Sequence, residues 1–279
     1  MYIRCWGSRG SLPASGAQYL KYGGDTSCIE VRSSKGDILV IDAGTGIRGL
    51  GDKLAAEKPG RIDMLFTHAH WDHIFGFPFF SPLYQKGIDI TIRGYPYPGK
   101  TYKEILSGFM SPPYFPVGLE VFRAKVKFGT INSRPFSIGA LKVRPIPLSH
   151  PDFGVGFRIE ERGKSFVFLT DNELSYVHEG GLVYNEYVGF AHSADLLIHD
   201  AEFTRKEYRQ YRTFGHSHFV EAIKLAIDSR AYRFGMFHHN RNRSDDEIDE
   251  IVSKARKIAE KENPDIDCFA VGSSFELKL

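Results

Sequence analysis

Short apolar runs bounded by glycine, serine and proline dominate the first half of the chain. Runs of about four to eight apolar residues with such boundaries are typical of buried strands. The first of them predict strands at residues 2–6, 28–32, 38–42 and 64–67. Later runs predict strands at 88–93, 120–127, 141–146, 154–161, 165–169, 196–199 and 234–237, with a hairpin turn at 162–164.

Helical spacing of apolar residues marks the remaining elements. A helix at 47–57 follows a glycine-rich turn in which Thr45 is the expected N-cap. Further helices are predicted at 102–109 and 219–229. A long helix follows Ser244, because Ser244-Asp245-Asp246-Glu247 is a capping box and the apolar residues after it keep one face.

Strands and helices occur in both halves of the chain, without an internal repeat or a low-complexity boundary. We therefore expect one α/β domain over residues 1–279. Residues 95–117 are rich in proline and aromatic side chains and are expected to form an ordered surface insertion, placed as a rim over the site.

Composition excludes several classes of protein. The formal net charge is only +2 and no basic block is present, which gives no reason to expect a nucleic-acid coat or a membrane surface. The N-terminal residues lack the pattern of a signal peptide, so a cytoplasmic protein is expected. The three cysteines form no C-x-x-C pair and are predicted to be buried apolar residues.

Possible metal ligands are most concentrated in the run Thr67-His68-Ala69-His70-Trp71-Asp72-His73. A strand that ends at Thr67 directs His68 and His70 to one side, where they can hold one metal ion. Asp72 and His73 lie where the chain turns into a helix and would face a second metal ion, with Asp72 placed to reach a shared water. The alternative is a set of capping or core histidines.

Metal sites need further ligands, and three more candidates directly follow predicted strands. These are His150, Asp171 and His238. Each alone has the simpler interpretation of a cap or turn residue. Their repeated placement at strand ends favours one site at the edge of a sheet.

These residues resemble the metallo-β-lactamase superfamily, most closely its ribonuclease Z-like and cyclic-nucleotide phosphodiesterase-like branch. The resemblance spans nearly the whole chain and implies a four-layer αββα sandwich. It implies a first metal ion bound by His68, His70 and His150, and a second bound by Asp72, His73 and His238, with Asp171 bridging both. His238 is preferred to His239 because it directly ends a strand. Two divalent ions are expected, zinc first, with manganese or iron as alternatives.

Two further motifs resemble those of ribonuclease Z-like enzymes. They are Leu197-Ile198-His199-Asp200-Ala201 and Gly215-His216-Ser217. The resemblance implies that Asp200 orients His216, which stabilises a phosphorane oxygen and donates a proton to the leaving alkoxide. The alternative for His216 and His218 is to cap the helix that begins at residue 219. Arg9, in a glycine-rich turn, is a candidate contact for an anionic substrate.

The resulting hypothesis is a phosphodiesterase with two metal ions, in which bridging hydroxide attacks phosphorus in line. The resemblance implies that processing of tRNA goes with a protruding Gly/Pro-rich arm and a basic surface. The insertion at 95–117 is instead short, aromatic and nearly neutral, so a small cyclic nucleotide is the favoured substrate. Nucleic acid is a less favoured partner, no membrane partner is expected, and a homodimer is suggested by the resemblance alone. The alternatives are an RNA 3′-end nuclease, a thioester or lactone hydrolase and a non-hydrolytic diiron redox protein.

Overall fold

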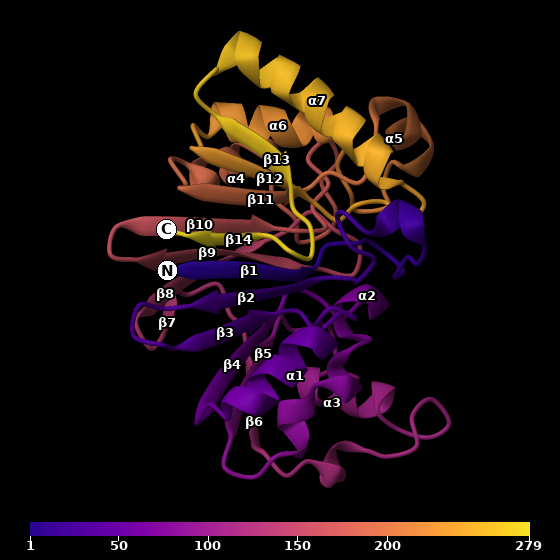
Figure 1. Cartoon of the computed structure of the whole chain (residues 1–279), viewed down its shortest axis with the longest axis vertical. Helices are drawn as coiled ribbons and strands as arrows, with labels where there is room; N and C mark the ends of the chain where they lie inside the picture. Colours follow the sequence, from indigo (N-terminus) through magenta and orange to yellow (C-terminus); the bar gives the residue numbers. More distant parts are fainter.

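The computed structural model describes residues 1–279. Two seven-stranded mixed sheets face each other at the centre of the molecule, and helices cover the outer face of each (Figure 1). The predicted αββα sandwich is confirmed. Both termini lie between the two halves, where the last strand pairs with the first (Figure 1).

The first sheet has the strand order β14-β1-β2-β3-β4-β5-β6. Its strands are β1 (Tyr2–Gly7), β2 (Cys28–Arg32), β3 (Ile38–Ile41), β4 (Arg61–Phe66), β5 (Asp89–Gly94), β6 (Lys125–Thr130) and β14 (Glu276–Lys278). The strands from β3 to β6 are parallel, and this direction brings their carboxyl ends to one edge.

The second sheet has the strand order β13-β12-β11-β10-β9-β8-β7. Its strands are β7 (Phe136–Ile138), β8 (Leu141–Pro147), β9 (Val155–Glu161), β10 (Lys164–Leu169), β11 (Leu196–Asp200), β12 (Arg233–Phe237) and β13 (Asp267–Ala270). The strands from β10 to β13 are parallel. Since β8 and β10 are both antiparallel to β9, β8 runs in the same direction as β10.

Seven α-helices accompany the sheets. They are α1 (Ile47–Glu57), α2 (Trp71–Ile74), α3 (Tyr102–Phe109), α4 (Tyr184–Ala191), α5 (Arg205–Tyr211), α6 (Phe219–Asp228) and α7 (Asp245–Glu262). Apolar side chains of α1 and α3 pack on the first sheet, and those of α4, α6 and α7 pack on the second. A third apolar cluster fills the space between the sheets, so each sheet is buried on both of its faces.

The sequence pattern predicts most of these elements to within two residues at each end, and the bounds of α1 and α3 agree at both ends. The capping box at Ser244 is also confirmed. Thr45 does not cap α1, because its hydroxyl accepts from the Thr26 N–H and donates to Asp25. The strand expected at 120–127 is wrong at both ends, because a short 3₁₀ helix at Leu119–Val121 precedes β6 and β6 continues to Thr130. The strand expected at 64–67 begins earlier, at Arg61.

Cys5, Cys28 and Cys268 are free and buried, as expected. No helix combines the length and the apolar character that crossing a bilayer requires.

Candidate metal centre

The candidate ligands all lie where strands end. His68, His70, Asp72 and His73 follow β4 and enter α2, while His150 follows β8, Asp171 follows β10 and His238 follows β12. The backbone φ of Asp171 is 55° and that of His238 is 56°, in the left-handed region that non-glycine residues adopt infrequently. Such backbone conformations are concentrated at functional sites, and here they come within two residues of the ends of β10 and β12.

The structure brings these residues together in two groups. The possible ligand atoms of His68, His70 and His150 lie within 4.8 Å of one another, and so do those of Asp72, His73, Asp171 and His238. All are buried except His70, whose side chain is 43% exposed. We refer to these seven residues as the His/Asp cluster.

Asp171 lies between the two groups. Its Oδ2 is 3.6 Å from Nε2 of His68 and 3.8 Å from Nε2 of His150. On the other side, Oδ1 is 3.3 Å from Nε2 of His73 and Oδ2 is 3.3 Å from Nε2 of His238. One carboxylate therefore contacts both groups, which is the arrangement that a bridging ligand requires.

The donor atoms of the His/Asp cluster fit divalent cations. Nε2 of His68, His73 and His150 are buried and have no hydrogen-bond partner. A buried polar atom without a partner is costly, and a cation would provide the missing partner. Imidazole and carboxylate ligands without thiolate are compatible with several divalent metals.

The protonation of His68, His150 and Asp171 agrees with this assignment. Burial lowers the pKa of His68 and His150, which keeps these imidazoles in the neutral form that binds a metal. Burial raises the pKa of Asp171, but the imidazoles of His238 and His73 outweigh it and hold the pKa well below the usual value. Asp171 is therefore ionised, as a ligand must be. Burial lowers the pKa of His73 and His238, but the charge of Asp171 outweighs it and raises both pKa values, so a metal ion would have to displace these protons.

Buried acids orient the histidines from behind. Nδ1 of His73 lies 2.8 Å from Asp42, whose carboxylate also accepts from the Thr67 N–H at 2.8 Å. Nδ1 of His238 lies 3.1 Å from Glu202, which accepts from the Asn240 amide at 2.9 Å. Such partners fix ring orientation and tautomer. Neither acid was expected from the sequence, although Asp42 ends a predicted strand and Glu202 follows Asp200 closely.

Asp200 and His216 form a pair beside the His/Asp cluster. Nδ1 of His216 is 2.8 Å from Oδ2 of Asp200, and its ring stacks on His238 at a centroid distance of 4.6 Å. Burial lowers the pKa of His216, but the charges of Glu202 and Asp200 outweigh it and raise the pKa to about 9. The pair adjoins the His/Asp cluster, since Nδ1 of His216 also lies 3.9 Å from Oδ2 of Asp171.

Glu173 anchors the turn that carries His216, a role that no local motif indicates. Its buried carboxylate accepts from Tyr208 Oη at 2.6 Å, from the Thr213 N–H at 2.8 Å and from the Gly215 N–H at 2.9 Å. His178 Nε2 lies 2.8 Å from the same carboxylate. Tertiary contacts alone identify this residue, because its partners are distant in sequence.

Three other residues that the sequence brings forward as candidates have structural roles instead. His239 points away from the His/Asp cluster, with Nε2 2.8 Å from the Val271 carbonyl. His218 caps α6 by accepting from the Glu221 N–H. Arg9 is fully buried and donates to the carbonyls of Gly23 and Arg243, so the expectation that it contacts an anionic substrate is wrong.

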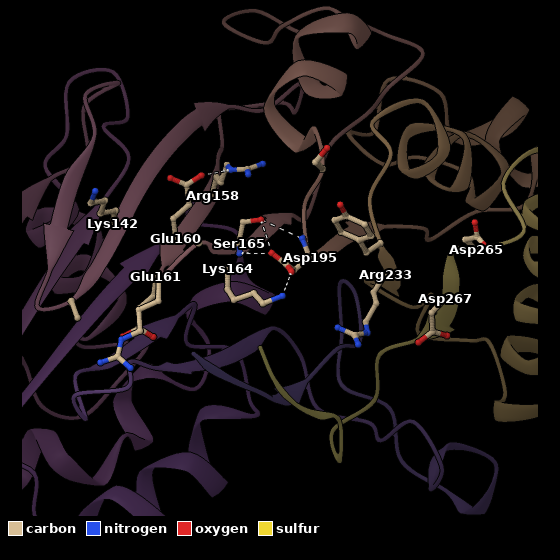
Figure 2. Close-up of a pocket in the computed structure, with 15 residues that line it drawn as sticks. Lys142, Arg158, Glu160, Glu161, Lys164, Ser165, Asp195, Arg233, Asp265 and Asp267 are labelled. Carbon is tan, nitrogen blue, oxygen red and sulfur yellow. Dashed lines mark hydrogen bonds and ion pairs between the residues drawn. The ribbon is translucent and has the colours of Figure 1, made fainter.

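The largest surface hollow, about 970 Å³, lies at the opposite ends of the strands (Figure 2). Lys164 and Asp195 line it at the starts of β10 and β11 and form an ion pair of 2.6 Å (Figure 2). Ligands of α/β sheets bind beyond the carboxyl ends of parallel strands. That rule favours the edge with the His/Asp cluster over this hollow.

Comparisons with known proteins agree with the fold. The model of a beta-lactamase superfamily domain matches residues 38–239. The ribonuclease Z of Oceanobacillus iheyensis is 24% identical over 245 residues, which cover 72% of this chain and 78% of that protein. A ribonuclease Z of Bacillus cereus is 26% identical over 246 residues, with the same coverage of each chain.

Solved structures share the fold across their whole length. The metallo-beta-lactamase fold protein YhfI from Bacillus subtilis is 18% identical, with a TM-score of 0.71 and 99% of each chain covered. Unliganded yeast PDE1 is 14% identical, with a TM-score of 0.71 and coverage of 100% of this chain and 99% of that chain. The chain therefore belongs to the metallo-β-lactamase superfamily, and ribonuclease Z proteins are among its relatives.

Proposed function

We propose that this protein is a phosphodiesterase that uses two divalent metal ions and acts on a small phosphodiester of the nucleotide class. The observation that carries the proposal is the Asp200–His216 pair, which lies beside the His/Asp cluster. Nδ1 of His216 is 2.8 Å from Oδ2 of Asp200. A thioester hydrolase expels a thiolate, which needs little protonation, whereas a phosphodiesterase must stabilise and protonate an alkoxide, and an imidazole fixed by a carboxylate can do both.

In this proposal His68, His70 and His150 hold one ion, and Asp72, His73 and His238 hold the other, with Asp171 contacting both. Such a pair of ions lowers the pKa of a water molecule and neutralises charge on the phosphoryl oxygens. Zinc is the first candidate, followed by manganese and iron. The Asp72 carboxylate is held in the orientation of a metal ligand, because its Oδ2 accepts from the Ser11 N–H at 2.8 Å.

His216 is proposed to donate the proton that the leaving oxygen needs. Asp200 accepts from Nδ1–H of the ring, which leaves Nε2 as the nitrogen available to the substrate. The second function of His216 is electrostatic, because an imidazolium next to a phosphorane oxygen stabilises its charge. Asp200 acts through His216, so it is a positioning residue.

The space beside His216 supports a small substrate. A hollow of about 300 Å³ adjoins His216 and is lined by polar residues that include Asn240, Arg241 and Asn242. This volume is at the lower end of small-molecule sites and suits the phosphate and sugar of a small substrate such as a 3′,5′-cyclic nucleotide. The three free cysteines are consistent with a reducing compartment such as the cytoplasm, which we propose as the location.

An RNA 3′-end nuclease is the second candidate, favoured by relatives named ribonuclease Z. The two candidates share the metal centre and differ in the partner. The experiment is turnover by protein reconstituted separately with zinc, manganese and iron, offered 3′,5′-cyclic nucleotides, a precursor RNA with a 3′ extension, an aryl phosphodiester and a thioester.

We expect cyclic-nucleotide turnover that falls about 100-fold or more in His216→Ala, because general acid catalysis contributes about 10²–10⁴-fold. His218→Ala is the matched control, since His218 lies two residues away and caps α6. Cleavage of the RNA and of no other substrate would favour the second candidate, an RNA 3′-end nuclease. Turnover of the thioester alone, or equal activity of His216→Ala and His218→Ala, would refute the proposal.

A further inference from the structure

A groove lined by aromatic side chains lies next to the His/Asp cluster. Its volume is about 640 Å³, within the range of small-molecule sites. Six aromatic residues line it, namely Trp71, Phe75, Phe79, Phe109, Tyr114 and Phe115. They come from α2 and the segment after it, and from α3 and the loop that follows.

These rings are unusually open to solvent. The exposed fraction is 71% for Trp71, 54% for Phe79 and 81% for Tyr114. The lining contains no charged side chain. Contiguous exposed apolar surface is costly to keep on a soluble protein and marks a binding site.

The groove is continuous with the candidate metal centre. Ala69 lies between His68 and His70 in the chain, Trp71 lies between His70 and Asp72, and both line the groove. A smaller hollow that is lined by His68 and His70 shares Ala69 and Ile105 with it. A group attached to a phosphodiester at the His/Asp cluster therefore has direct access to the rings.

The wall of the groove is fixed relative to the ligands. The Tyr102 hydroxyl, at the start of α3, donates to the His68 carbonyl at 2.8 Å. A capping box at Thr101 defines where α3 begins. The rings pair edge to face, with a centroid distance of 6.1 Å between Phe75 and Phe109 and 5.9 Å between Phe79 and Phe115. The site is thus built before a ligand enters.

We infer that this groove binds an uncharged aromatic ring carried by the phosphodiester substrate, either a nucleobase or an aryl ester group. This inference rests on the proposed function and adds the part of the substrate that determines specificity. Rings prefer offset or edge-to-face contact with aromatic side chains. Stacking is insensitive to the identity of the base, which suits a lining without charged groups.

One position allows the groove to be filled without disturbing its walls. Gly108 lines the groove, and a Cβ added there would meet no atom within 4 Å. Gly108→Leu therefore places a side chain in the open space. Gly189 is the matched control, because it is also exposed, also lies in an eight-residue helix and also has open space around its Cβ, but it belongs to α4 on the other sheet.

The first measurement is quenching of tryptophan fluorescence in the metal-loaded full chain. The probes are adenosine for the nucleobase arm, benzyl alcohol for the aryl arm, and ribose as a polar control. None contains phosphorus, so binding is read independently of turnover. We expect quenching by one or both rings and not by ribose, lost in Trp71→Phe, and weakened about tenfold or more in Gly108→Leu but not in Gly189→Leu.

The second measurement compares kcat/KM for phenyl and methyl 4-nitrophenyl phosphate. We expect the phenyl ester to be favoured about tenfold or more, with the preference lost in Gly108→Leu and kept in Gly189→Leu. Absence of ring binding, or equal behaviour of the two glycine variants, would overturn the inference while leaving phosphodiesterase activity intact. Absence of turnover with all phosphodiesters would instead refute the proposed function. A dimer that Gly108→Leu dissociates would show that a second copy covers the groove, and would also overturn the inference.

Discussion

Replacement of Glu173 by Gln should separate the positioning of His216 from metal binding. The carboxylate accepts at Oε1 from Tyr208 and Thr213, and at Oε2 from Gly215. His178 Nε2 also lies 2.8 Å from Oε2. An amide has a single acceptor oxygen, and its NH₂ group would face donors. About half of these contacts would therefore lose their acceptor.

The expected cost in stability follows from burial. A buried donor without a partner costs about 1–3 kcal/mol, so two of them would lower the free energy of unfolding by about 2–6 kcal/mol. At about 2 °C per kcal/mol, the melting temperature should fall by at least about 4 °C.

A cost in catalysis is also expected. Thr213 has a φ of 73°, which is strained for a β-branched residue, and Glu173 holds the turn before His216 by the N–H groups of Thr213 and Gly215. A displacement of about 1 Å costs about 100-fold in rate. We expect kcat to fall by about that factor while the metal content measured by elemental analysis stays unchanged.

Glu161→Gln is the control for loss of stability alone. Glu161 is also a buried glutamate that accepts several hydrogen bonds, from the Ser34 N–H at 2.9 Å and the Ser34 hydroxyl at 2.7 Å, but it lies at the opposite ends of the strands. This variant should lose stability and keep kcat. Unchanged kcat in Glu173→Gln would refute the positioning role, as would a loss of bound metal.

Three further outcomes follow from the same structure. Asp171→Ala should lose bound metal and turnover together, as measured by elemental analysis and phosphodiester hydrolysis, and retention of both would contradict the bridging role. Asp200→Asn should lower kcat by about 10²-fold or more and keep bound metal, because the amide cannot replace the carboxylate next to His216. Burial, with the charge of Glu173, raises the pKa of Glu221 from 4.5 to about 7, so the folded state binds more protons than the unfolded state between these values. Stability should therefore fall as pH rises from about 5 to 7, and chemical denaturation should show a flatter pH profile for Glu221→Gln.

The sequence predicts elements that combine clear periodicity with local end signals. The helices α1 and α3 match the expected bounds, and Thr101 caps α3 with a complete capping box. The helices α4 and α5 were missed for different reasons. Short length, a glycine and several aromatic residues hide α4, whereas the capping box at Thr204 was a signal that could have located α5.

The residues of the candidate site also divide into those with a local sequence signal and those without one. Residues that come within three residues of a strand end, such as His150, Asp171 and His238, can be recognised because the parallel strands bring their carboxyl ends to one edge. The structure places them together, and the assignment of individual metal ligands stays a prediction until a metal is measured. Glu173 and Glu202 could not be found in this way, because their partners are distant in the chain.

The cost of burying so many ionisable groups is offset within the site itself, at the edge where the strands of both sheets end. Asp42, Asp171 and Glu202 are buried carboxylates, and each would be costly in an apolar medium without a partner. Each contacts at least one imidazole here, so opposite charges and hydrogen bonds offset the loss of hydration. Apolar clusters inside and outside both sheets hold the strand ends in register. The imidazole nitrogens that remain without partners are consistent with a cation as the last component, whose binding would then contribute to the stability of the fold.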